Sequence, residues 1–219
     1  MAPSSTSNEI RIEPGAEVLA DVSMNNSHPV SQHDNLGKRK PFVRVESLDR
    51  LKWNVLASPS TIEAVDFDES GEVCWRPLLL DPKHPLADEA VTELPIPRMG
   101  VKLVMIEYWK SLGMMDEAPP PLVIDNTDGR TITIEQFVLR VSEYAYSLRE
   151  MLCEIEDREP SSQESAEIYY YSTGAPKLQE PGNLYVFPLN FKTNESSSVH
   201  EIEAQWVRRE RLFVENYGG

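Results

Sequence analysis

Residues 134–157, IEQFVLRVSEYAYSLREMLCEIED, have the most regular apolar pattern in the chain. Its apolar side chains recur at alternating intervals of four and three residues, a spacing that places them on one face of an α-helix. Charged glutamates occupy the other side. The apolar positions are Phe137, Val141, Tyr144, Leu148, Met151 and Ile155. The pattern predicts one continuous amphipathic helix from about Ile134 to about Asp157.

A start signal precedes this helix. Thr133 and Gln136 have the spacing of a capping box, in which the first side chain satisfies a free N–H group of the first helical turn. A stripe of this regularity suits either a core face within one domain or a coiled coil with another chain. We interpret it as a core face that packs against a sheet of the same chain.

Residues 124–137, IDNTDGRTITIEQF, also suggest a calcium loop. An EF-hand loop needs oxygen ligands at its first, third and fifth positions, glycine at its sixth and glutamate at its twelfth. With Gly129 at the sixth position, the first is Ile124, whose side chain has no oxygen. A second candidate loop, residues 66–77, has Pro77 where the glutamate is required. We interpret both stretches as glycine turns and predict no metal site and no cofactor.

Several short segments have the pattern of β-strands. Residues 61–68 alternate apolar and polar side chains, and residues 72–75 resume an extended pattern after a turn at 69–71, which is typical of a β-hairpin. Pro188 indicates a strand end or a sheet edge, since proline cannot donate to a ladder. Three further runs are predicted strands: Leu122–Ile124, Ile168–Tyr171 and Leu184–Phe187.

Two further segments have helical spacing. Residues 100–113 place Val101, Val104, Tyr108 and Leu112 on one helical face, and Gly113 follows where a helix would end. Residues 199–214 fit either a helix or a strand, and we favour a helix with Ser198 and Glu201 as its capping box. Together the elements predict one α+β domain, in which a mostly antiparallel sheet packs against the long helix and one or two shorter helices.

The chain has 219 residues, of which 21 are basic and 36 acidic, giving a formal net charge of −15. Residues 1–41 are rich in Ser, Asn, Pro and Gly and have few large apolar side chains, so we predict a disordered polar tail. Residues 42–219 are predicted to form the single folded domain. The basic run Lys38-Arg39-Lys40 suits either a solvated charge cluster or a short nuclear import signal.

The acidic balance and the cysteines bear on partners and compartment. A negatively charged folded part repels phosphate backbones, so we predict that it binds no nucleic acid. No apolar run approaches the roughly 20 residues of a membrane helix, and the first residues lack the charge pattern of a secretory signal. Cys74 and Cys153 lie in apolar patterns and are predicted to be buried free thiols. These features predict a cytoplasmic or nuclear protein that does not bind membranes.

The sequence assigns no catalytic residue. It has no GxSxG nucleophile motif, no GxxxxGK phosphate loop and no GxGxxG fingerprint. The histidines have no metal-like spacing; they are His28, His33, His84 and His200. Carboxylates are abundant, and Asp49, Asp66 and Asp68 are named only as acid–base candidates.

Aromatic residues point to binding. The run Tyr169-Tyr170-Tyr171 puts rings on both faces of a strand, so helices of the same domain or another chain must cover the second face. Tyr169, Tyr171 and Trp206 are the predicted partner-binding residues, because tyrosine and tryptophan are enriched at interfaces.

Two hypotheses follow. The first is a non-catalytic, intracellular protein–protein interaction module with an acidic surface. Its partner is another protein, and the sequence also allows a homo-oligomer. The alternative is a small cofactor-independent enzyme that acts on an apolar molecule in a pocket between sheet and helix. A closed apolar cavity containing His84, His200 or a carboxylate would favour the enzyme. A filled core with an exposed Tyr or Trp patch would favour the module.

Overall fold

The computed structural model describes residues 42–155, 167–179, 184–193 and 199–218. The predicted polar tail, residues 1–41, lies outside them, and so do its basic run and its two histidines. Ser198 and the predicted helix end at Asp157 also lie outside the described residues.

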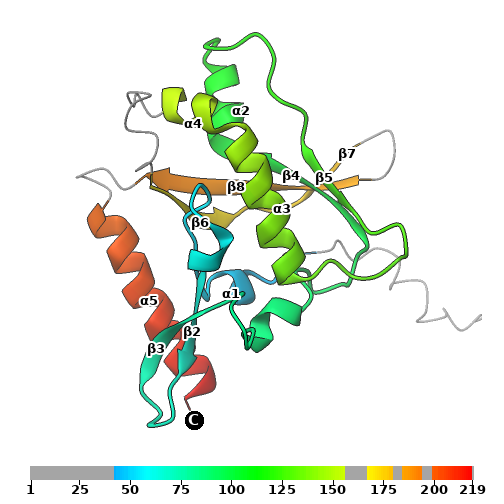
Figure 1. Cartoon of the computed structure of the whole chain (residues 1–219). Coiled ribbons are helices and arrows are strands. Elements are labelled where there is room, and N and C mark those ends of the chain that lie inside the picture. The colour runs from blue at the N-terminus through cyan, green and yellow to red at the C-terminus, as the bar shows by residue number, and fades with distance from the viewer. Residues whose placement is uncertain (1–41, 156–166, 180–183, 194–198, 219) are drawn as a thin grey trace, which may run out of the picture. The chain divides into compact units, whose positions relative to one another are not determined.

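Two sheets and five α-helices make up the described part of the fold (Figure 1). The larger sheet has the order β5-β4-β8-β6, and β7 also pairs with β8. Every pair in it is antiparallel except β4–β8, which is parallel. Its strands are β4 (Arg98–Leu103), β5 (Leu122–Asp125), β6 (Ile168–Thr173), β7 (Lys177–Gln179) and β8 (Leu184–Thr193).

A smaller antiparallel sheet has the order β1-β2-β3 and consists of β1 (Leu51–Lys52), β2 (Glu63–Phe67) and β3 (Val73–Pro77). The helices are α1 (Val45–Leu48), α2 (Val104–Ser111), α3 (Ile134–Ser147), α4 (Arg149–Ile155) and α5 (Val199–Tyr217). The prediction of an α+β fold is therefore confirmed. Across the described segments, no helix is both long and apolar enough to cross a membrane.

The predicted hairpin is formed by β2 and β3. Its turn contains Gly71 at a φ of 81°, a conformation that glycine adopts without strain. The side chain of Asp68 accepts hydrogen bonds from the backbone N–H groups of Ser70, at 2.8 Å, and Glu72, at 2.9 Å. The carboxylate of this second candidate calcium loop therefore stabilises the turn, as an aspartate in an Asx-turn does.

The capped start of the long helix is confirmed, but its continuity is wrong. The hydroxyl of Thr133 accepts a hydrogen bond from the N–H of Gln136 at 3.2 Å. α3 then ends at Ser147, and Leu148 adopts a non-helical φ of −105° and ψ of 13° before α4 begins. The Ser147 hydroxyl donates to the carbonyl of Tyr144 at 2.7 Å. The Tyr144 carbonyl thus accepts both this bond and one from the N–H of Leu148 at 3.2 Å, and such back-bonding weakens or bends a helix.

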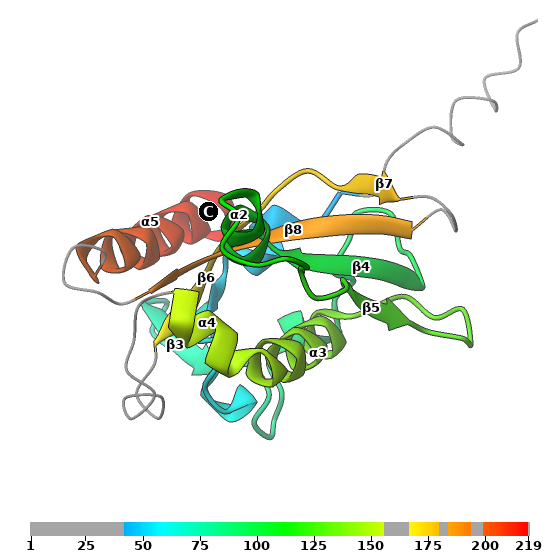
Figure 2. The same ribbon diagram turned by 90° about the horizontal axis from the view of Figure 1, so that it is seen from above.

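The apolar stripe of this helix pair lies against a sheet of its own chain, as predicted. Phe137 and Val141 are fully buried, and α3 crosses one face of the larger sheet (Figure 2). Trp53 joins the two layers, because its ring centroid lies 6.3 Å from that of Phe137 and 5.8 Å from that of Tyr170 on β6. Its indole N–H donates to Ser142 of α3 at 3.1 Å, so the polar edge of this buried ring is satisfied.

The prediction of a helix over residues 100–113 is wrong in its first half. Residues 98–103 form β4, in which Met99, Val101 and Leu103 alternate into the core. A Cβ atom at Gly100 would lie 2.9 Å from Cγ2 of Val186 on β8, so any larger residue would force the Val186 side chain to shift. The helix begins at Val104 instead.

The interpretation of Pro188 as a strand end or edge is also wrong. β8 continues through it to Thr193 and lies inside the sheet. The Pro188 carbonyl accepts a hydrogen bond from Gly174, in the short gap between β6 and β7. The N and the C=O of one strand residue point to the same side. The nitrogen of Pro188, which carries no hydrogen, therefore also points to the gap between β6 and β7 and not to β4, so the pairing of β8 with β4 loses no hydrogen bond.

The carboxyl-terminal segment is a helix, as we favoured. α5 and α3 lie on opposite sides of the larger sheet (Figure 2).

Candidate functional site

The predicted partner-binding aromatic residues lie where α5, which carries Trp206, packs on Tyr169 and Tyr171 of β6. The rings of Tyr169 and Trp206 contact each other edge to face, with centroids 5.2 Å apart. The ammonium of Lys52 lies 4.5 Å from the Trp206 ring, and that of Lys192 lies 4.2 Å from the Tyr171 ring. All three aromatic residues are half-buried. A helix of the same chain thus covers this face of β6, and the role of these residues in partner binding stays a prediction.

A buried arginine also links α5 to β1 and β6. Arg209 is 4% exposed and donates to the carbonyl of Leu51 on β1 and, at 3.1 Å, to that of Tyr171 on β6. Its guanidinium lies 3.7 Å from the carboxylate of Asp49. Burial raises the pKa of Asp49, while Arg209 and Arg208 oppose that shift.

The acid–base candidates lie in three different surroundings. Asp66 Oδ2 is 3.2 Å from Nε2 of His84, although that nitrogen is not in line for a hydrogen bond. Nδ1 of His84 accepts from the N–H of Leu86 at 3.1 Å and caps a short 3-10 helix. Burial lowers the pKa of His84. Asp68 stabilises its turn and Asp49 faces Arg209, so the three aspartates form no common acid–base site.

The first candidate calcium loop is a turn. Gly129 has a φ of 76°, and Asp128 accepts a hydrogen bond from the N–H of Arg130 at 3.0 Å. The Asn126 amide nitrogen donates to the carbonyl of Arg130 at 3.0 Å. This confirms the interpretation of a glycine turn before α3. Within the described ranges, His, Cys, Asp and Glu side chains nowhere cluster in groups of three that could hold a metal ion.

The two cysteines differ. Both are free, and Cys153 is buried at 1% exposure, as predicted. Cys74 is only half-buried, which corrects the prediction for that residue. It lies on β3 at the margin of the smaller sheet, where one strand neighbour is absent. Partial burial, and then the carboxylates of Asp68 and Asp66, raise the pKa of its thiol.

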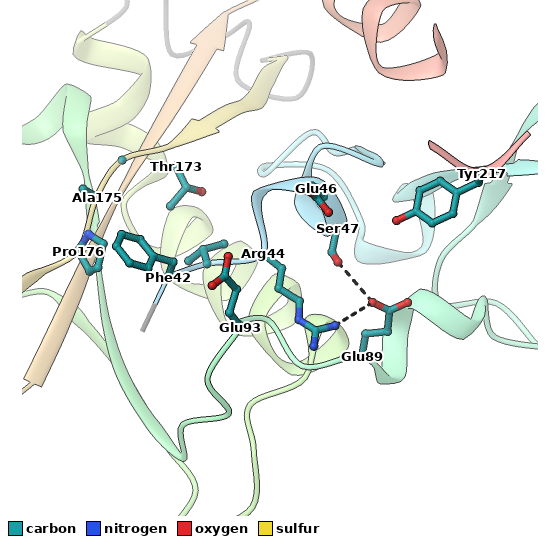
Figure 3. Close-up of a pocket in the computed structure, with 12 residues that line it drawn as sticks. Phe42, Arg44, Glu46, Ser47, Glu89, Glu93, Thr173, Ala175, Pro176 and Tyr217 are labelled. Carbon is teal, nitrogen blue, oxygen red and sulfur yellow. Dashed lines mark hydrogen bonds and ion pairs between the residues drawn. The ribbon is translucent and has the colours of Figure 1, made fainter. Parts of the chain in front are cut away.

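An open groove of about 490 Å³ lies where four separate segments meet, and we call it the acidic groove (Figure 3). The residues that give it its character are Phe42, Arg44, Glu46, Glu89, Glu93 and Tyr217. Figure 3 shows Phe42 beside Pro176 at one end and Tyr217 at the other, with the carboxylates between them. No local sequence pattern marked this site, because its residues are far apart in the chain.

Short backbone pairings position the groove residues. The N–H of Arg44 donates to the carbonyl of Val91, and the N–H of Glu93 donates to that of Phe42, both at 2.9 Å. Val43, which pairs with this second segment, is buried at 4% exposure. Since side chains alternate along an extended segment, the Phe42 and Arg44 side chains point outward.

The charges in the groove are only partly neutralised. The guanidinium of Arg44 lies 3.6 Å from Glu89, which also accepts a hydrogen bond from Ser47 at 3.3 Å. Glu46 and Glu93 have no ion-pair partner among the residues that the structure describes. Three carboxylates and one guanidinium leave the lining with two uncompensated negative charges.

The aromatic ends of the groove are accessible. Phe42 is 47% exposed and Tyr217 is 52% exposed. The inner side of the Tyr217 ring packs on Phe213, with centroids 5.1 Å apart, and lies 5.4 Å from the guanidinium of Arg50. An exposed ring held in this way provides a firm surface for another group.

Comparisons of the whole chain with protein-family models, with curated proteins and with solved structures find no match.

Proposed function

We propose that this chain is a non-catalytic interaction module that binds a basic segment of a partner protein in the acidic groove. The observation that carries the proposal is the pair of uncompensated carboxylates, Glu46 and Glu93, between the exposed rings of Phe42 and Tyr217. Carboxylates form charge-assisted hydrogen bonds with guanidinium and ammonium groups, and aromatic faces attract the same cations.

The size and charge of the groove support this proposal. A volume of about 490 Å³ accommodates a few side chains of a peptide. The net charge of −15 also gives the surface a field that accelerates encounters with basic partners, and this effect weakens as salt increases.

The space that the alternative enzyme would need is occupied by side chains. The rings of Trp53, Phe137 and Tyr170 fill the volume between the larger sheet and α3. Neither His84 nor His200 lines the acidic groove. A filled core supports the interaction module over a pocket between sheet and helix. The two free cysteines fit a cytoplasmic or nuclear setting, which is part of the proposal.

Binding of a fluorescein-labelled peptide of alternating arginine and glycine, measured by fluorescence anisotropy, tests the proposal. The double variant Glu46→Gln/Glu93→Gln should bind about tenfold more weakly, since two contacts of about 0.7 kcal/mol each make 1.4 kcal/mol. The control Glu150→Gln/Glu154→Gln changes the net charge equally, on α4. If both double variants lose the same affinity, only the overall charge matters, and the groove is not the site.

A further inference from the structure

α2 packs on the core through Ile106 and Met105 and leaves its opposite side exposed. Its sequence is VMIEYWKS, and Ile106 is its one buried residue, at 3% exposure. Val104, Tyr108 and Leu112 follow one another at intervals of four residues, so they share one helical face. Tyr108 is 62% exposed and Leu112 is 55% exposed.

This face continues into a groove, which we call the α2 groove. It has a volume of about 420 Å³ and is bounded by α2, β7 and β8. Val104 lies at its α2 side and Val186 and Pro188 line it from β8, while Leu178 of β7 is 48% exposed. The stripe from Val104 to Leu112 rises about 12 Å along the helix axis, and it meets the groove at Val104, which belongs to both.

The charges of the α2 groove are opposite to those of the acidic groove. It is lined by Lys102 and Lys177, and Glu107 is the one carboxylate among its lining residues. Glu107 lies 3.3 Å from the ammonium of Lys102. Lys177 is exposed and has no ion-pair partner in the described part of the chain. The lining therefore carries one net positive charge on a chain whose total is −15.

We propose that the α2 groove binds an acidic segment of a partner protein whose aliphatic side chains cover Val104, Tyr108 and Leu112. The apolar surface stabilises burial of aliphatic groups, at roughly 25 cal/mol per Å². Beside this apolar surface, Lys177 and Lys102 favour partner segments that carry carboxylates over segments that carry ammonium groups. A second copy of this chain fits less well, because two chains of this charge repel each other. The two grooves share no lining residue, although Pro176 of one precedes Lys177 of the other, and they select segments of opposite charge.

Three fluorescein-labelled peptides of about a dozen residues, added to the full-length protein, test this. As helices they are about 18 Å long, enough to cover the stripe of about 12 Å. Their compositions are leucine with glutamate, leucine with lysine, and serine with glutamate. The leucine–glutamate peptide should bind at least about tenfold more tightly than either of the others. In ¹⁵N spectra it should shift the amides of Val104, Tyr108 and Val186.

Two variants locate the site. Lys177→Glu and Leu112→Ser should each weaken the leucine–glutamate complex by about five- to tenfold without changing the melting temperature, because both side chains are exposed. Arg130→Glu makes the same charge reversal at a residue whose side chain is 86% exposed, and should leave affinity almost unchanged.

Equal binding of all three peptides, or an unchanged affinity in Lys177→Glu, would overturn the proposal. So would a concentration-dependent dimer in sedimentation that Leu112→Ser abolishes, since the occupant would then be a second copy.

Discussion

Replacement of Arg209 by alanine should release α5 from the sheets and lower the stability of the whole fold. The arginine side chain is 2% exposed, so its hydrogen bonds are shielded from solvent, whereas the side chain of Asp49 is 33% exposed. It donates to two backbone carbonyls, of Leu51 and Tyr171, that belong to different sheets. It also lies 3.7 Å from the carboxylate of Asp49.

The expected loss follows from these contacts. A hydrogen bond from a charged donor contributes about 1.5–3 kcal/mol, and removal of one partner of a buried ion pair costs about 3–5 kcal/mol. The Tyr171 carbonyl keeps a second donor, the side-chain amide of Gln205 at 2.7 Å, which limits the loss. We therefore expect Arg209→Ala to lower the free energy of unfolding by about 3 kcal/mol.

Urea unfolding followed by circular dichroism and tryptophan fluorescence measures this change. Arg211→Ala is the matched control, because it removes the same side chain two residues away on α5 where it is 70% exposed. It should change stability by less than about 0.5 kcal/mol. Arg209→Lys should restore only part of the loss, since lysine cannot reach two carbonyls with a planar fork.

The pH dependence checks the part played by Asp49. Burial already raises its pKa above 3.8, and without Arg209 the carboxylate has lost an opposing positive charge. A group whose pKa is raised by folding binds its proton more readily in the folded state. The destabilisation by Arg209→Ala should therefore shrink as the pH falls from 7 toward 3.8. A loss below about 1 kcal/mol at pH 7, or one that does not depend on pH, would refute this reasoning.

Four further changes have expected outcomes. Burial lowers the pKa of His84 below 6.5, so the unfolded state takes up a proton at a higher pH than the folded state does. The free energy of unfolding of the wild type should therefore fall as the pH drops below 6.5. In urea unfolding, His84→Asn, which can still cap the turn, should reduce this dependence on pH. Asp68→Ala should speed amide exchange in the β2–β3 turn, since the carboxylate accepts from two of its N–H groups. Phe137→Ala should cost about 3–5 kcal/mol in the same urea titration, because a fully buried ring is replaced by a cavity. A thiol reagent should modify Cys74 before Cys153, which is 1% exposed and should react only on unfolding.

The sequence predicted those elements whose signals are local. The four–three spacing from Phe137 onward and the Thr133 cap depend only on neighbouring residues, so α3 begins where predicted. The turn at Gly129 has the same origin. Pro188 was misjudged because its tolerance depends on a gap between two other strands, which a local pattern does not encode.

The candidate sites could not be predicted in the same way. The acidic groove joins segments around Phe42, Glu93, Thr173 and Tyr217, and only the fold brings them together. Two of the predicted partner-binding residues, Tyr169 of β6 and Trp206 of α5, contact each other, so this contact joins two elements of the same chain. A sequence can show that aromatic rings need a cover, yet it does not show which element supplies it.

The error at residues 100–113 has a physical consequence for the surface. Val101, Val104, Tyr108 and Leu112 would share one buried face if the whole segment were helical. The chain is instead extended up to Leu103, and extended and helical residues turn their side chains by different angles. Val101 therefore enters the core through β4, and Ile106 does so from α2. Tyr108 and Leu112 keep their helical register with the half-buried Val104 but are exposed, so the change from strand to helix at Val104 leaves the apolar stripe on the surface.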